Sequence, residues 1–252
     1  MAKLNEIISF ADDLLNTDEI KDYCPNGLQV EGRSEVNHII TGVSACMDLF
    51  EEALKRNADA VLVHHGMFWD NDSRVVCGNI RKRLTLLLKN NISLIGYHLP
   101  LDRHPEVGNN IQLVRRLGLV EPEPFGMYGG KSISYIAKTS KPTNIGELLK
   151  TVSTTLKREA RHFAFGPNKV NVVAICSGSA PELIREAVRV KADVFITGEE
   201  TEWVYNFSKE EKIHYVAAGH HATEKFGVME LGDRIKKKFD VEVEFVDIPN
   251  PI

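Results

Sequence analysis

Apolar stretches rich in β-branched residues alternate with amphipathic stretches of helical period along almost the whole chain. Strands that alternate with helices of this length indicate α/β layers with right-handed crossover connections. We therefore expect an α/β fold, with helices near 47–57, 78–91, 109–118, 143–157, 181–191 and 222–239. The expected strands are "HIITGV", "DAVLVHH", "ISLIGYH", "SISYIAK", "NVVAICSG", "DVFITG", "HYVAAGH" and "VEVEFVDI".

The two halves of the chain resemble each other. The dipeptide Ala-Asp at 58–59 recurs 134 positions later, and the same offset matches further residues of the preceding helix. The next strand aligns at an offset of 122, which places His98 on His220 and Asp102 on Glu224. The recurrence of a histidine followed four residues later by an acid favours an internal duplication.

This duplication predicts two similar, intertwined halves, residues 1–125 and 126–252. The segment 118–131 ("GLVEPEPFGMYGGK") carries the prolines, glycines and acids of an irregular connection. We expect the boundary between the halves to lie in this segment.

Charge and composition exclude several classes of protein. The net charge of −4 gives no global basic surface for nucleic acid, and "RIKKKF" near the end reads as the solvated face of a helix. The four cysteines form no CxxC pair, so we expect free thiols in a reducing, cytoplasmic setting. The N-terminus reads as an amphipathic helix and not a signal peptide, and no run has the length of a membrane span.

Three of the expected strands end in histidine. "ADAVLVHH" delivers two histidines, while "LIGYHLPLD" and "YVAAGHHATE" each deliver a histidine followed by a carboxylate. Sites in open α/β folds collect at the carboxyl ends of strands. Each pattern alone is more often a turn or an exposed helical pair, but the three together favour a metal site. The candidate ligands are His64, His65, Asp102, His220 and Glu224, with His98 nearby.

Three imidazoles and two carboxylates exceed what one tetrahedral zinc ion needs. They suit two divalent ions with a bridging carboxylate, and an activated water would then be the nucleophile of a hydrolysis. Nitrogen and oxygen ligands without sulfur fit Fe, Mn, Zn, Co or Ni. We expect Pro100 to make "HLPLD" a turn that holds Asp102 at the sheet edge, and Glu224 to open a helix.

Three loops carry further candidates. In "DYCPNGLQVEG" (22–32), Asn26 and Gln29 bind a polar ligand or fasten a tight turn. Glu199 in "TGEE" is a carboxylate near the site, a general acid/base, or an acid at a helix N-terminus. "CSGSAPE" is a loose match to an anion-binding loop before a helix. His38, His104, His162 and His214 lack such contexts, and we expect structural roles for them.

At these residues the chain resembles the dinuclear-metal proteins called GTP cyclohydrolase 1 type 2 homologues, or Ngg-interacting-factor-like proteins. The segments that carry the resemblance extend in order over nearly the entire chain, and it is closest to the compact bacterial form. They are "DYCPNGLQVEG", "TGV", "ADAVLVHHGMFW", "YHLPLDRHPEVGNN", "DVFITGE", "AAGHHATE" and "FVDIPNP".

The resemblance implies a metal pair in a cleft between two similar α/β halves and a ring-shaped homohexamer. It carries the ligand roles over to His64, His65, Asp102, His220 and Glu224, and makes His98 a pocket residue. GTP cyclohydrolase activity is assigned to some family members. This sequence contains no P-loop, and Arg74 and Arg103 are the nearest cations for a phosphate, with an ordinary surface role as the alternative.

These features leave three hypotheses about function. The first is a metal-dependent hydrolase of GTP or a related nucleotide, in which His98 or Glu199 transfers protons. The second is a metal-binding or metal-handling protein, or a regulator, without turnover. The third is nucleic-acid processing through a ring, against which the acidic net charge weighs.

Overall fold

The computed structural model describes residues 1–252 and contains two compact units. The first unit comprises 1–101 and 227–249, and the second comprises 102–226 and 250–252. The chain enters the second unit within helix α4 (Leu99–Arg103) and returns within α10 (Lys225–Phe239). Both units are α/β, as expected. Each unit is assembled from two separate segments, whereas the sequence analysis placed a single boundary between the halves near residue 125. No helix is both long and apolar enough to cross a membrane.

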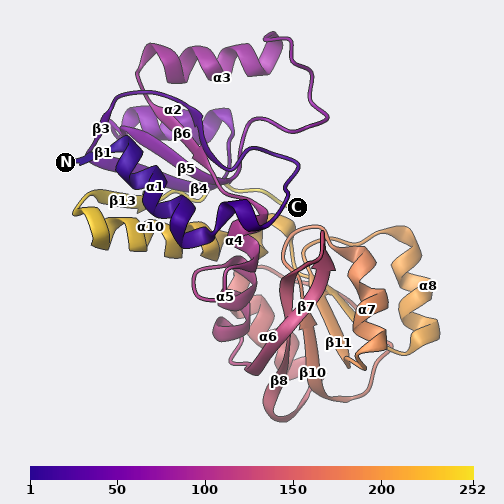
Figure 1. The fold of residues 1–252 in the computed structure, drawn as a ribbon. Coiled ribbons are helices and arrows are strands. Elements are labelled where there is room, and N and C mark those ends of the chain that lie inside the picture. Colours follow the sequence, from indigo (N-terminus) through magenta and orange to yellow (C-terminus); the bar gives the residue numbers. More distant parts are fainter. The chain divides into compact units, whose positions relative to one another are not determined.

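The first unit is built on a five-stranded sheet of order β13-β4-β5-β6-β2, in which only β2 is antiparallel to its neighbour. Helices α2 and α3 cover one face, while α1 and α10 cover the other (Figure 1). Its remaining elements are β1 (Ala2–Lys3), α1 (Leu4–Leu15), η1 (Thr17–Glu19), β2 (Gly27–Val30), β3 (Glu35–Val36), β4 (His38–Ser44), α2 (Met47–Lys55), β5 (Ala60–His65), α3 (Gly78–Lys89), β6 (Ser93–Gly96) and β13 (Glu242–Phe245).

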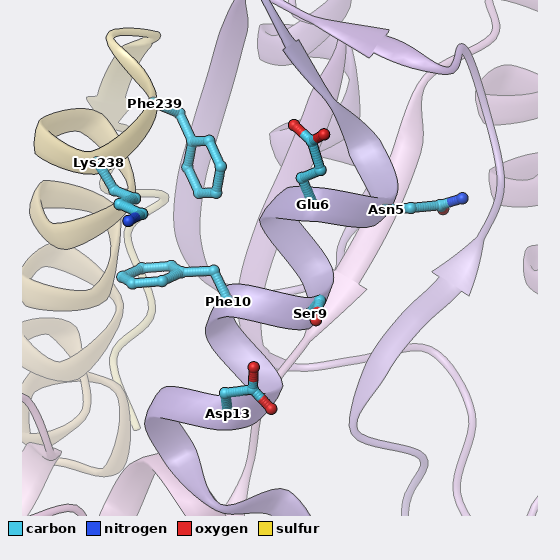
Figure 2. A pocket seen from close by; sticks show the side chains of 7 residues that line it. All are labelled: Asn5, Glu6, Ser9, Phe10, Asp13, Lys238 and Phe239. Carbon is cyan, nitrogen blue, oxygen red and sulfur yellow. The ribbon is translucent and has the colours of Figure 1, made fainter.

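The N-terminal helix shows why these elements form. Its apolar residues recur at helical spacing and bury one stripe of α1, namely Leu4, Ile7, Ala11 and Leu15. Phe10 packs edge-to-face on Phe239 at the end of α10, with ring centroids 5.6 Å apart (Figure 2). Lys236, Lys237 and Lys238 of "RIKKKF" are exposed, which confirms the solvated face.

The second unit is built on a six-stranded sheet of order β7-β8-β10-β11-β12-β9, parallel only at its centre. Helices α7 and α8 pack on one face around buried Phe195 and Tyr215. Its elements are α5 (Asn109–Arg116), β7 (Val120–Tyr128), β8 (Lys131–Asn144), α6 (Ile145–Leu156), β9 (Arg161–Phe163), β10 (Lys169–Ile175), η2 (Pro181–Leu183), α7 (Ile184–Arg189), β11 (Val194–Thr197), α8 (Glu202–Glu211), β12 (His214–Ala217) and α9 (His220–Thr223).

The expectation of an irregular connection over 118–131 was wrong. The segment forms β7, which pairs with β8 across a turn at Gly129 and Gly130. Its prolines are tolerated because β7 is an edge strand with partners on one side only. Most of β7 is also exposed, which explains its polar composition. The sequence of an edge strand that buries few side chains therefore resembles that of a loop.

Atomic contacts show that the two units are duplicates. Asp59 accepts hydrogen bonds from the backbone N–H groups of residues 37 and 38, at 2.7 and 3.1 Å. Asp193, 134 positions later, accepts the corresponding bonds from residues 171 and 172, at 2.7 and 2.9 Å. The pairing of β4 with β5 and of β10 with β11 also matches at this offset. The internal duplication is confirmed.

The offset of 122 at the following strand was wrong by one residue. Ala60 pairs with Ser93, and its counterpart Val194 pairs with His214, so β6 and β12 correspond at an offset of 121. At that offset His220 corresponds to Leu99 and not to His98. The histidine-acid patterns of the two units are therefore displaced by one position.

Candidate metal centre

Two neighbouring parallel strands of the first unit bring three imidazoles together. His64 and His65 end β5, and His98 follows β6. The ring centroid of His64 lies 4.6 Å from that of His65 and 5.0 Å from that of His98. One nitrogen from each ring lies within 4.8 Å of the others, which is close enough for a shared metal ion. We call these residues the imidazole cluster.

Each ring of the imidazole cluster is held by an oxygen at its Nδ1 atom. His64 Nδ1 lies 2.9 Å from the backbone oxygen of Tyr97. His65 Nδ1 lies 3.0 Å from Ser44 Oγ, and His98 Nδ1 lies 2.9 Å from Asp22 Oδ1. The Tyr97 carbonyl and the Asp22 carboxylate can only accept, so they keep the proton on Nδ1 of His64 and His98 and leave Nε2 as the basic nitrogen, which is the usual arrangement of metal-binding histidines. The cluster therefore fits a divalent cation.

Asp22 is a site residue that the sequence did not single out. Its carboxylate accepts hydrogen bonds from Tyr23 N, His98 Nδ1, Asn26 Nδ2 and Leu99 N, at 2.8–3.0 Å. Burial alone would raise the pKa of Asp22, but the bonds and charge from His98 and the other donors hold it below its usual value. Asp22 is therefore an ionised acceptor that orients His98.

The Asn26 and Gln29 side chains form hydrogen bonds within the protein. Asn26 Oδ1 accepts a bond of 2.8 Å from His98 N. Gln29 joins Pro25 O to Met67 N, with both bonds at 2.8 Å. Of the two alternatives for these amides, the contacts favour fastening the loop over binding a ligand.

The second unit brings together two carboxylates and an imidazole. Asp102 is buried in α4 and accepts bonds from Asn109 Nδ2 at 2.9 Å and Ser177 Oγ at 3.1 Å. "HLPLD" is a short helix and not the expected turn, because Pro100 falls in its first turn, where no N–H is needed. An oxygen of Asp102 lies within 4.8 Å of one of Glu224.

His220 lies between two carboxylates. Its Nδ1 contacts Glu199 Oε1 at 2.5 Å, and its Nε2 contacts Glu224 Oε2 at 3.0 Å. His220 opens α9, and Glu224 follows that helix at its C-terminal cap. The spacing of four residues therefore places both side chains toward one point, as expected. Glu199 contacts the imidazole directly, a geometry that orients a metal-binding histidine.

The environment of His220 makes it basic in the metal-free protein. Burial disfavours its charged form, but the hydrogen bonds and negative charges of Glu224 and Glu199 outweigh burial and raise its pKa to about 9. A raised histidine pKa stabilises the fold fully below the unfolded value of about 6.5, and this contribution is lost as the pH rises through about 9.

We expect the unfolding free energy of the metal-free protein to fall between pH 7 and pH 10, because His220 loses its proton there. Urea denaturation at several pH values checks this. Glu224→Gln should reduce the fall, since it removes the charge that raises the His220 pKa. An equal slope in the two proteins would contradict this assignment.

The "CSGS" loop supports the site and is not an anion cradle. Ser177 N donates to Asn110 Oδ1 at 2.7 Å, and Gly178 N donates to Thr223 Oγ1 at 3.0 Å. An anion would have to displace these acceptors, so the anion-binding interpretation was wrong. Ser177, Asn109 and Thr223 were missed because they lie in a loop, at the start of α5 and at the end of α9, and only the tertiary fold brings them to the site.

His38, His104, His162 and His214 lie in structural contacts, as expected. His104 Nδ1 accepts the backbone N–H groups of Glu106 and Val107. His38 contacts Arg56 O, and His162 contacts His214 at the start of β12. The four cysteines are free thiols, as expected.

Comparison with known proteins places this arrangement in a family. The family model described as Duf34/NIF3 (NGG1p interacting factor 3) matches residues 2–251. The chain belongs to the Duf34/NIF3 family. A Pseudomonas aeruginosa relative named GTP cyclohydrolase 1 type 2 homolog is 42% identical over 248 residues, 98% of each chain. An Escherichia coli (strain K12) relative of the same name is 42% identical over 253 residues, 99% of each.

Solved structures of similar chains share this fold. The structure of protein ybgI, described as of unknown function, superposes with a TM-score of 0.95 at 41% identity, covering 100% of both chains. TTHA1606 from Thermus thermophilus gives a TM-score of 0.92 at 31% identity, also covering 100% of both. The resemblance inferred from the sequence is therefore confirmed for this Duf34/NIF3 protein.

Proposed function

We propose that this protein binds two divalent metal ions and acts as a metal-dependent hydrolase on GTP or a related nucleotide. The proposed ligands are His64, His65, Asp102, His220 and Glu224. The observation that carries the proposal is the Nδ1 contact of His64 with a carbonyl oxygen and of His220 with a carboxylate, because these acceptors at Nδ1 leave Nε2 for a metal. When bound, the ions supply Lewis acidity and lower the pKa of a coordinated water.

Two further residues have proposed roles beside the metal ligands, one in proton transfer and one in positioning. The His98 Nδ1–H donates to Asp22, so His98 Nε2 is the atom that takes a proton and later returns it. Glu199 was expected to transfer a proton or to stand beside the site. Its contact with His220 Nδ1 favours a positioning role, in which it keeps the proton on that nitrogen and the ring in place.

Turnover by metal-reconstituted protein tests the proposal. We expect GTP or another nucleotide of a panel to be hydrolysed, and Asp102→Ala and Glu224→Ala to abolish the activity. His162→Ala is the matched control, since this half-buried histidine of β9 is not a proposed ligand and its ring contacts His214 Nδ1. Activity that survives loss of either carboxylate would overturn the proposal. Metal binding without turnover of any nucleotide would instead support the metal-handling alternative.

The assembly is an expectation from the resemblance, and the location is an expectation from the cysteines and the N-terminal sequence. We propose a homohexameric ring in a reducing cytoplasm, in which the free thiols are stable. Light scattering should then give six times the chain mass of 28.3 kDa. A monomer or dimer at micromolar concentration would contradict the ring.

A further inference from the structure

The first unit contains a cavity of about 530 Å³ outside the imidazole cluster. It is formed by the long loop that follows β5 and by the first turns of α3. Cavities of this size lie within the range that binds cofactors and nucleotides. None of the proposed metal ligands lines it.

Apolar and aromatic groups form one part of the lining, among them Trp69, Phe68 and Ile80. The Trp69 ring centroid lies 5.2 Å from that of His98 and 6.0 Å from that of His65. Trp69 therefore lines the cavity and also packs beside two rings of the imidazole cluster. Aromatic faces of this kind stack on nucleobases irrespective of sequence.

Two arginines line the same cavity and are not otherwise engaged. Arg74 lies in the exposed loop and Arg83 on α3, and neither forms an ion pair or a side-chain hydrogen bond. Guanidinium groups bind phosphate oxygens through paired N–H donors. Their position around an aromatic surface suits a ligand that is both planar and anionic.

Two carboxylates also line the cavity, Asp70 and Asp72. Only their backbone N–H groups are used, in bonds to Tyr23 O and Trp69 O. A carboxylate repels phosphate but accepts N–H donors. The guanine edge offers two adjacent N–H donors, whereas adenine offers an acceptor at the corresponding ring nitrogen.

We propose that this cavity binds a purine nucleotide with preference for guanine. The base stacks on Trp69, Asp70 and Asp72 accept the guanine N–H groups, and Arg74 and Arg83 hold the phosphates. The inference rests on the proposed function in one respect, since it takes the nucleotide as the substrate of the adjacent centre. It extends that function by naming the residues that select the substrate.

Binding of GTP, ATP and guanosine to the full-length chain, measured by calorimetry with and without divalent metal, tests the inference. We expect Trp69→Leu to weaken GTP binding about 10-fold and Trp69→Phe to retain most of it. The double variant Arg74→Ala/Arg83→Ala should weaken GTP far more than guanosine. Asp70→Asn/Asp72→Asn should reduce the preference for GTP over ATP.

Arg81→Ala is the matched control, because Arg81 is an exposed arginine of α3 that does not line this cavity. Circular dichroism confirms that each variant is folded. GTP binding that is unchanged in the Trp69 and arginine variants, or absent from the wild-type chain, would overturn the inference. Metal content measured on the same samples separates the two proposals, since loss of the nucleotide site leaves metal binding intact.

Discussion

Gly178→Ala is expected to weaken the proposed metal binding strongly in an otherwise folded protein. Gly178 has φ +66°, and a Cβ built on it would overlap Glu224 Oε1 and lie 3.3 Å from His220 Nε2. Glu224 is buried, so its carboxylate must leave the position in which it faces His220 and Asp102. We expect metal affinity to fall about 100-fold or more, because loss of a proposed ligand should cost at least as much as the 10–100-fold lost when a group that only supports a ligand is disturbed. Competition with a chromophoric chelator measures it.

Gly118→Ala separates steric overlap from backbone strain. Gly118 has nearly the same conformation, φ +67°, but a Cβ there meets nothing within 4 Å. Both substitutions should cost about 1–2 kcal/mol of stability from the left-handed backbone. Only Gly178→Ala should release metal. Equal metal affinity in the two variants would show that Glu224 does not contribute to the site.

The second large effect is expected at the duplicated aspartates. Asp59→Ala leaves two backbone N–H groups at the start of β4 without their acceptor, and Asp193→Ala does the same at β10. Hydrogen bonds to a charged group contribute about 1.5–3 kcal/mol each, so each variant should lose about 3 kcal/mol or more of unfolding free energy. Urea denaturation with tryptophan fluorescence measures the loss.

Asp233→Ala is the control for this prediction, because Asp233 is an exposed aspartate of α10. It should change the unfolding free energy by less than about 0.5 kcal/mol. Asp59 also pairs with Arg33 at 2.7 Å, a contact that Asp193 lacks. If both aspartate variants lose much less unfolding free energy than typical deletions of buried hydrogen bonds, water replaces the carboxylate.

The sequence predicted the α/β fold and the strand ends that deliver the site because apolar runs report buried parallel strands directly. It could not predict β7, whose exposed residues and prolines carry no strand period. The sequence also could not show the correct alignment of β6 with β12. Matching His98 to His220 suggested an offset of 122, whereas the paired strand residues give 121.

The residues that hydrogen-bond to the candidate site residues were harder to predict than the site residues themselves. His64, His65 and His98 are marked by their positions after strands, whereas Asp22 and Ser177 are ordinary loop residues in the sequence. Asp22 contacts His98 from 76 positions away, and Ser177 contacts Asp102 from 75 positions away. Such contacts depend on the tertiary fold, and no local pattern reports them.

The division of each unit into two segments imposes an order on synthesis. Strand β13 pairs in parallel with β4, so the first sheet lacks one edge until the last residues leave the ribosome. The second unit is almost complete by residue 226, before that strand exists. At about 5–20 residues per second, the 144 residues from the end of the first segment to the end of β13 take roughly 7–29 s, and the nascent first unit waits that long for its final strand. The first unit therefore begins to form first but is completed last. Until β13 is made, the edge of β4 is open to incorrect partners.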